Sequence, residues 1–338
     1  MKCAVVLALC SFLLVSCTGK SDRKLNHDKK DEPKIGFSID TLIVERWRQD
    51  CDVFVSTAKE SGTDVIIQDA ANSVQEQIRQ IEYLIGEGVK ALVIVAKESD
   101  SLSQVLQKAR AKNIPVIAYD RLIRNADISL YVTINSQKVG RLMAGALKNV
   151  QPEGGYWCIY GSEADYNMAL INEGVMSVLS GTNISVDLKY YTPDWNYDLA
   201  YQKMNGLLKL NLHPTAVICG NDAVAENVIR ALSEHKLGKT IPVVGQDAEV
   251  LACRRIADGI QTATVYKPIT DLAIKAAQCA CFLAQGHSVE EMTEITEKID
   301  NGEKMIPVIY LEPVLVTKDN LSEVIIDSGF HSANEIFR

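Results

Sequence analysis

Short apolar runs alternate along the chain with segments in which apolar residues recur every three to four positions. From residue 34, the runs KIGFSI, DVIIQDA, ALVIVA and PVIAYDR are separated by segments of helical period. A second series follows with GYWCIYG, ISVDLKYY, AVICGND, PVVGQDA and ATVYK. Continuous apolar strands that alternate with helices are typical of parallel sheets covered on both faces. The pattern therefore predicts an α/β fold with two doubly wound domains of roughly five strands each.

The first 33 residues do not follow this pattern. Residues 4–15 form an apolar stretch that is too short to span a membrane, and it ends in LVSC at 14–17. LVSC resembles the lipobox of bacterial lipoproteins, which implies a signal peptide at 1–16 and acylation of Cys17. Residues 17–33 are polar and charge-dense, and we predict that they form a flexible tether. The alternative is an ordinary signal peptide, or a short membrane anchor, with an incidental cysteine.

Composition and motifs exclude several classes of function. A net charge of −8 argues against a nucleic-acid partner, which would need a basic face. The chain has no C-x-x-C motif, its five histidines are scattered, and it lacks a G-x-G-x-x-G, a P-loop and a G-x-S-x-G elbow. We therefore predict no catalytic residues, no metal ligands and no cofactor. The six cysteines after residue 17 fall mostly in apolar surroundings, and we predict mostly free, buried thiols.

Polar residues follow nearly every predicted strand. In open parallel sheets, ligands bind beyond the carboxyl ends of the strands. Any one of these residues could instead cap a helix, but together they predict the lining of a cleft. The strand-end residues are Asp40, Gln68, Asp69, Asp120, Arg121, Asn135, Gly161, Ser162, Asn221, Asp222, Gln246, Asp247 and Lys267.

Several longer motifs carry a family resemblance. KIGFSIDTLIVERWRQD, VIAYDRLIRNADI, VGQDAE, TATVYKPIT and DSGFHS resemble the D-xylose-binding proteins of bacterial ABC importers, nearly collinearly from residue 34 to the C-terminus. The resemblance implies the type I periplasmic binding protein fold, with two lobes joined by a three-segment hinge around a sugar. The implied lobes are residues 34–135 plus 268–312 and residues 136–267 plus 313–338, with crossovers near Asn135, Lys267 and Glu312.

The resemblance also implies a set of sugar-binding residues, in which carboxylates accept from hydroxyls and Asn, Arg and Lys donate to them. Trp47 and Trp195 would supply flat apolar faces, although Trp47 could simply be core and Lys267 merely a hinge residue. Asn221 is assigned to the ligand and Asp222 to capping, and Arg121 is expected to neutralise Asp120 in the empty cleft. The full set is Arg46, Trp47, Asp120, Arg121, Asn167, Trp195, Asn221, Asp247 and Lys267.

The function implied is capture of D-xylose, or of a close monosaccharide, and its delivery to an ABC permease by a lipid-anchored extracytoplasmic receptor. A receptor that signals to a membrane histidine kinase is the main alternative. A sugar-responsive repressor core and a xyloside hydrolase are remote ones. KESD at 97–100 and DYN at 165–167 depart from the family pattern, which leaves the exact sugar open.

Overall fold

The computed structural model describes residues 33–338 except 44, 296 and 338. Residues 33–338 form one compact unit. The predicted signal peptide, the acylated Cys17 and nearly all of the predicted tether lie outside the described residues. Within the described part of the chain, none of the helices is both long enough and apolar enough to cross a membrane.

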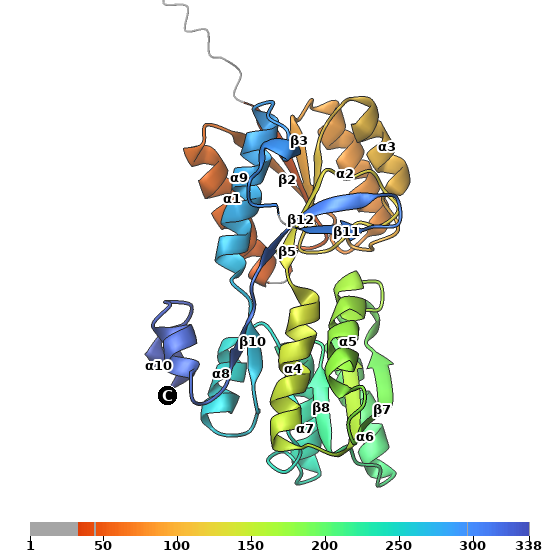
Figure 1. The fold of residues 1–338 in the computed structure, drawn as a ribbon, viewed down its shortest axis with the longest axis vertical. Helices are drawn as coiled ribbons and strands as arrows, with labels where there is room; N and C mark the ends of the chain where they lie inside the picture. Colours follow the sequence, from red (N-terminus) through yellow and green to blue (C-terminus); the bar gives the residue numbers. More distant parts are fainter. Residues whose placement is uncertain (1–32, 44, 296, 338) are drawn as a thin grey trace, which may run out of the picture. The chain divides into compact units, whose positions relative to one another are not determined.

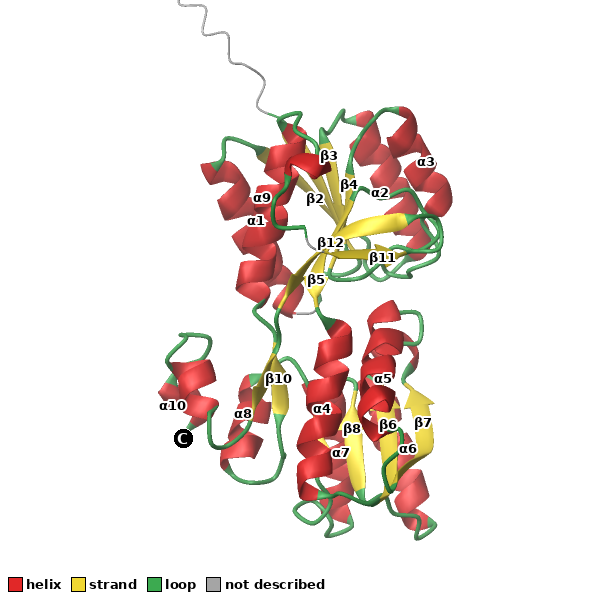
Figure 2. Cartoon of the chain, viewed as in Figure 1, coloured by secondary structure: helices red, strands yellow, loops and turns green. Residues whose placement is uncertain are grey.

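The first of two main sheets contains seven strands in the order β11-β12-β5-β4-β3-β1-β2 (Figures 1 and 2). All neighbouring strands are parallel except β11, which pairs antiparallel with β12. The strands are β1 (Lys34–Ile39), β2 (Asp64–Asp69), β3 (Ala91–Ile94), β4 (Val116–Tyr119), β5 (Leu130–Ile134), β11 (Glu297–Asp300) and β12 (Met305–Leu311). We call this sheet and the helices packed on it the first lobe.

Helices cover both faces of this sheet because successive strand residues point to opposite sides. Phe37 packs with Phe54 of one helix layer, whereas the neighbouring Gly36 lies against Leu84 and Leu92 on the other face. Two separate apolar cores result, one on each face. The helices are α1 (Glu45–Glu60) and α9 (Ile269–Ala284), which contact each other, and α2 (Val74–Gly86) and α3 (Ser103–Ala111), which do likewise.

The second lobe contains a four-stranded parallel sheet in the order β7-β6-β8-β9 and a two-stranded antiparallel ribbon, β10-β13. Its strands are β6 (Gly154–Tyr160), β7 (Ile184–Tyr191), β8 (Ala216–Cys219), β9 (Val243–Val244), β10 (Thr264–Tyr266) and β13 (Val314–Val316). Its helices are α4 (Ser136–Val150), α5 (Tyr166–Leu179), α6 (Tyr197–Lys209), α7 (Asp222–Glu234), α8 (Val250–Ala257) and α10 (Ala333–Ile336).

The predicted α/β class with parallel sheets is confirmed, but the expected strand count is wrong for both lobes. The first sheet gains β11 and β12 from the C-terminal part of the chain, and β10 pairs with the returning β13. Periodicity along the first 270 residues could not reveal these pairings, because they join segments that are far apart in sequence. The chain passes between the lobes three times, between β5 and α4, between β10 and α9, and between β12 and β13.

The prediction of free, buried cysteines is confirmed. All six cysteines of the described part are buried and none forms a disulfide. They lie in helices and strands and behave as small apolar core residues.

Candidate functional site

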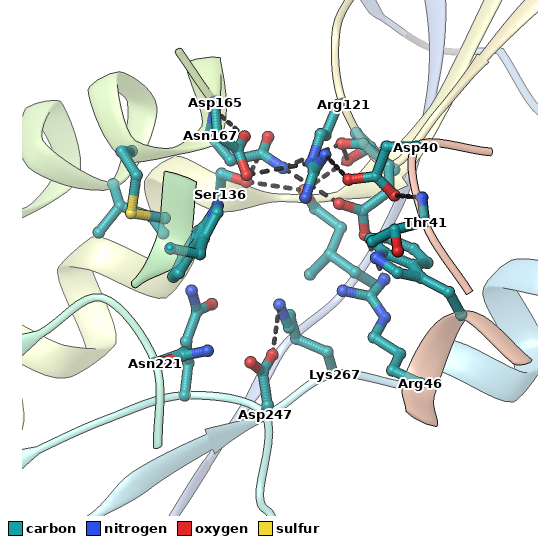
Figure 3. A pocket seen from close by; sticks show the side chains of 18 of the residues that line it. Asp40, Thr41, Arg46, Arg121, Ser136, Asp165, Asn167, Asn221, Asp247 and Lys267 are labelled. Carbon is teal, nitrogen blue, oxygen red and sulfur yellow. Dashed lines mark hydrogen bonds and ion pairs between the residues drawn. The ribbon is translucent and has the colours of Figure 1, made fainter. Parts of the chain in front are cut away.

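A cavity of about 300 Å³ lies between the two lobes, at the carboxyl ends of their parallel strands (Figure 3). All nine predicted ligand-binding side chains line it: Arg46, Trp47, Asp120, Arg121, Asn167, Trp195, Asn221, Asp247 and Lys267. The structure thus brings them together, while their contact with a sugar stays a prediction. Two other strand-end residues do not line the cavity and make local hydrogen bonds instead. Asn135 caps α4, and Asp69 accepts the backbone N–H of Ala71 at 2.8 Å.

Asp120 directly follows β4 and anchors the first-lobe wall of the cavity. It is 5% exposed and has a positive φ of 62°, a backbone conformation that aspartate tolerates better than most residues. Arg46, in the first turn of α1, donates to its Oδ2. Burial acts to raise the pKa of Asp120, but Arg46 and Lys267 outweigh it and hold the pKa below its ordinary value. Asp120 is therefore an ionised acceptor.

The direct ion-pair partner of Asp120 is Arg46 and not the expected Arg121, which contributes only a smaller lowering of the pKa of Asp120. Arg121 Nη1 donates to Asp40 Oδ2 at 2.6 Å and to the carbonyl of Ala96 at 3.1 Å, and its Nε lies 3.1 Å from Asp165 Oδ2. Adjacent residues point in different directions here because the backbone turns sharply at Asp120. Burial acts to lower the pKa of Arg121, but Asp40 and Asp165 raise it above the ordinary arginine value.

Trp47 is both a core residue and a cavity residue. It is 4% exposed and packs edge-on against Tyr119, while its ring also lines the cavity. The guanidinium carbons of Arg46 and Arg121 lie 4.3 Å and 5.5 Å from the ring centroid. The two roles considered for Trp47, core residue and cavity residue, are therefore compatible, because one indole can fill the core and present an edge to the cavity.

Asn167 connects the second lobe to the first. Its Nδ2 donates at 3.1 Å to both the carbonyl and the Oδ1 of Asp120. Ser136 donates to Asn167 Oδ1 at 3.2 Å, which fixes the orientation of the amide. Asp165 caps α5 by accepting the backbone N–H of Asn167 at 3.1 Å, so the same carboxylate that faces Arg121 also starts the helix that presents Asn167.

The expectation that Asp222 caps the helix is wrong, because Asn221 takes that role while it also lines the cavity. Asn221 is the cap of α7, because its Oδ1 accepts the backbone N–H of Val224 at 2.8 Å. Its side chain still lines the cavity together with Tyr197, to which it hydrogen-bonds. Asp222 is fully buried behind the cavity wall and bonds to Gln261 and Thr264.

Asp247 and Lys267 form the wall contributed by β9 and β10. Lys267 Nζ lies 2.5 Å from Asp247 Oδ1, so Lys267 is an ion-pair partner inside the cavity and not merely a hinge residue. Asp247 and Ala248 have positive φ angles of 100° and 53°. Such angles are strained for residues other than glycine and persist only where surrounding contacts enforce them.

Trp195 enters the cavity from a short turn before α6. Asp194 and Trp195 both have positive φ, at 52° and 56°. The indole lies flat against Gly161, where a Cβ atom would come within 2.2 Å of the ring. Among the described residues, no group accepts the buried Nε1–H of Trp195, a residue that lines the cavity. The neighbouring Asp194 accepts from Lys97 of the first lobe at 2.8 Å.

The charges of the lining nearly balance, with three cations and five carboxylates, one of which (Asp194) is paired with Lys97. A balanced set of acceptors and donors suits a neutral polyhydroxyl ligand better than an anion or a cation. In the part of the chain that the structure describes, no cluster of three histidine, cysteine, aspartate or glutamate side chains could hold a metal ion.

The nine-residue prediction missed several lining residues. Asp40 and Gln246 stand at strand ends and could have been chosen on that ground. Asp165 lies two residues before Asn167 and caps α5. In the sequence it is therefore indistinguishable from an ordinary helix cap. Thr41, Ser136, Asp194 and Tyr197 also line the cavity, but nothing in their local sequence distinguishes them from ordinary loop or helix residues.

Comparison with known proteins agrees with this architecture. Residues 35–288 match the family of the periplasmic binding protein domain. The chain is 40% identical to the D-xylose-binding periplasmic protein of Haemophilus influenzae, covering 90% of this chain and 92% of that protein. It is 38% identical to the protein of the same name from Escherichia coli, covering 98% of each. An ABC transporter solute-binding protein from Clostridium phytofermentans, solved with bound β-D-glucose, has a TM-score of 0.81 at 30% identity, covering 90% of this chain and 99% of that one.

The fold and the cavity between the lobes are those of an extracytoplasmic solute-binding protein. The chain belongs to the periplasmic binding protein family, with the type I fold. The relatives named above are solute-binding proteins and not enzymes.

Proposed function

We propose that this protein captures D-xylose, or a close monosaccharide, in the cavity between its lobes and delivers it to an ABC permease. The observation that carries the proposal is the lining itself: near-balanced charge, carboxylate acceptors from both lobes, and a buried indole N–H without an acceptor among the described residues. The identity of 38–40% with two D-xylose-binding periplasmic proteins supports D-xylose as the first ligand to test.

In this proposal each wall of the cavity has a defined task. Asp120 and Asp247 accept bonds from sugar hydroxyls, and Arg46, Arg121, Lys267, Asn167 and Asn221 donate to hydroxyl or ring oxygens. Trp47 and Trp195 cover the C–H surfaces of the ring. Hydrogen bonds to charged groups are the stronger kind, worth about 1.5–3 kcal/mol each, so a small ligand can be held by a few of them.

Movement of the lobes would make the bound form recognisable to a partner. The proposed lobes are residues 34–135 plus 268–312 and residues 136–267 plus 313–338, joined at the three connections between the sheets. Bonds that already join the lobes, such as Asn167 to Asp120 and Arg121 to Asp165, would change with that movement. Small-angle scattering with and without sugar tests this, since closure predicts a smaller radius of gyration.

We further propose that acylated Cys17 anchors the protein to a membrane. The LVSC motif and the following polar segment support this part of the proposal. Cys17→Ser should move the protein from the detergent phase to the aqueous phase in Triton X-114 partitioning. Equal partitioning of both forms would refute the lipid anchor and leave sugar binding untouched.

The proposed membrane partner is an ABC permease, and a membrane histidine kinase is the second candidate. A receptor of this family can present its closed form to a permease or to a kinase. Co-purification from membranes in the presence of D-xylose, followed by identification of the bound protein, separates a permease from a kinase.

A further inference from the structure

Asp222 is a buried carboxylate that does not line the cavity but bonds to residues beside the cavity wall that carries Asp247. It is 0% exposed, and its Oδ2 accepts from Thr264 Oγ1 at 2.7 Å and from the backbone N–H of Glu249 at 3.1 Å. Its Oδ1 accepts from Gln261 Nε2 at 2.8 Å. Its own backbone N–H donates to the carbonyl of Gln246 at 2.9 Å.

These bonds enclose the loop 246–249, which carries Asp247 into the cavity. Asp247 and Ala248 lie at positive φ, so the loop needs outside contacts to keep its conformation. Thr264 supplies one further contact, because the hydroxyl that donates to Asp222 accepts the N–H of Ala248 at 3.2 Å. Asp222 is thus bonded to the loop on both sides of Asp247, at Gln246 and at Glu249.

The residues around the carboxylate of Asp222 leave room for it and satisfy its oxygens. A Cβ atom at Gly245 would come within 2.2 Å of Asp222 Oδ1, so only glycine lets the end of β9 approach so closely. Arg255 donates to the backbone carbonyl of Asp222 at 3.3 Å and not to its carboxylate. The carboxylate oxygens are therefore satisfied by groups that fix the loop and its neighbouring strand.

We propose that Asp222 is a positioning residue that holds the loop 246–249 so that the carboxylate of Asp247 and its partner Lys267 face the sugar. This inference rests on the proposed sugar-binding function of the cavity. Asp222 acts through Asp247 and does not contact the ligand itself.

The test compares four variants of the full chain by calorimetric titration with D-xylose and by denaturant unfolding. Asp222→Ala removes the three bonds to the carboxylate, and we expect about 10- to 100-fold weaker binding. Val228→Ala is the control, because Val228 is fully buried on the same helix, lies in the second-lobe core and does not line the cavity. It should lower stability and leave the dissociation constant unchanged.

A swapped pair separates positioning from bulk stability. In Asp222→Asn combined with Gln261→Glu, the new amide donates to the new carboxylate, and its oxygen still accepts from Thr264 and Glu249. The new carboxylate keeps the bond from Arg255 Nε that Gln261 accepts at 3.0 Å, and the carbonyl of Ala263 keeps its bond from Gly245. We expect this double variant to bind within about threefold of the parent, and Asp222→Asn alone to bind more weakly.

Equal weakening by Asp222→Ala and Val228→Ala, or no weakening by Asp222→Ala, would overturn the inference while leaving the proposed function intact. Failure of the unsubstituted protein to bind any sugar would instead overturn the proposed function. Amide hydrogen exchange of the ligand-free protein measures whether the loop 246–249 depends on Asp222, whether or not the protein binds a sugar. Asp222→Ala should expose the amides of Ala248 and Glu249 to fast exchange, and unchanged protection would contradict the inference.

Discussion

The two lobes build their walls of the cavity in different ways. In the first lobe, the charged groups are already engaged with one another: Arg46 with Asp120, and Arg121 with Asp40. In the second lobe, Trp195 has a buried N–H that no described residue accepts. The second-lobe carboxylate Asp247 lies on a strained loop, and its ion-pair partner is Lys267 and not a guanidinium.

This difference indicates a division of labour. Pre-paired charges keep the first wall fixed and ionised before a ligand arrives, so little reorganisation is needed on binding. Buried donors without a hydrogen-bond partner among the described residues occur on both walls, at Arg46 and Arg121 on the first and at Trp195 on the second. Substitutions should therefore have their largest effects where a fixed charge is lost, and smaller ones where a single donor is lost.

The largest effect is expected from Asp120→Asn. Asparagine tolerates the positive φ at this position but removes the charge that pairs with Arg46. Loss of a charge-assisted bond of about 2.7 kcal/mol corresponds to about 100-fold weaker sugar binding. Calorimetric titration measures this directly.

Asp127→Asn is the matched control, since Asp127 pairs with Arg110 and Lys304 in the first lobe and does not line the cavity. Its dissociation constant should equal that of the unsubstituted protein. If Asp120→Asn also retained full affinity, the first wall would not contribute a fixed acceptor.

Asp120 of the first lobe and Asp222 of the second should respond to pH with opposite sign. Burial raises the pKa of Asp222 to about 7, whereas the pKa of Asp120 is held below its ordinary value. Because the pKa of Asp222 is higher in the folded than in the unfolded protein, the contribution of Asp222 to stability is fully present below its unfolded pKa. That contribution is lost as pH rises through about 7. The contribution of Asp120 is present above the unfolded pKa and is lost as pH falls below it.

Denaturant unfolding of the unsubstituted protein and of Asp222→Asn between pH 5 and 7 isolates the contribution of Asp222, because Asp50, whose pKa is raised by burial to about 6, titrates in both proteins. Asp222 should contribute a fall in unfolding free energy of up to about 1.4 kcal/mol per pH unit as pH rises. Asp222→Asn should flatten that slope, because an amide does not titrate in this range. The same slope in both proteins would show that Asp222 does not change protonation on folding in this window.

A smaller effect on binding is expected from Trp195→Phe. The aromatic face remains, and the loss of one N–H donor, worth about 1 kcal/mol, predicts about fivefold weaker binding with little loss of stability. Trp47→Phe should behave differently, because Trp47 is core and its ring contacts two guanidiniums. It should lower the unfolding free energy by about 1–2 kcal/mol. Identical effects of the two substitutions would remove the distinction between the lobes.

The smallest effect is expected at the ion pair between Lys97 and Asp194, which joins the lobes. Asp194 is 69% exposed in its side chain, so solvent screens the pair. A double-mutant cycle with Lys97→Met and Asp194→Asn should give a coupling energy for sugar binding below about 1 kcal/mol. A coupling of several kcal/mol would mean that this pair controls closure of the lobes.

The sequence predicts the strands, most helices and the edge of the sheets where ligand-facing residues gather, because apolar periodicity and strand ends are local features. It does not predict the partners of individual charges. Asp120 and Arg121 are neighbours, yet the turn at Asp120 sends them to Arg46 and Asp40. The capping of α7 by Asn221 also depends on backbone geometry that the residue types alone leave open.

The apolar periodicity of the sequence also cannot predict that β12 pairs with β5 or that β13 pairs with β10. These contacts join segments about 180 and 50 residues apart, and sequence patterns carry no record of such distances. The family resemblance supplied what periodicity could not, namely the return of the chain and the set of nine cavity residues.

The most direct test of sugar capture is calorimetric titration of residues 33–338, which form a compact unit, with D-xylose, D-glucose, L-arabinose and D-ribose. The proposed function predicts micromolar or tighter binding of D-xylose and weak responses to the other three. Tight binding of a different sugar would keep the cavity as a sugar site and shift attention to Lys97 and Tyr166. Absence of binding to all four would contradict the proposal.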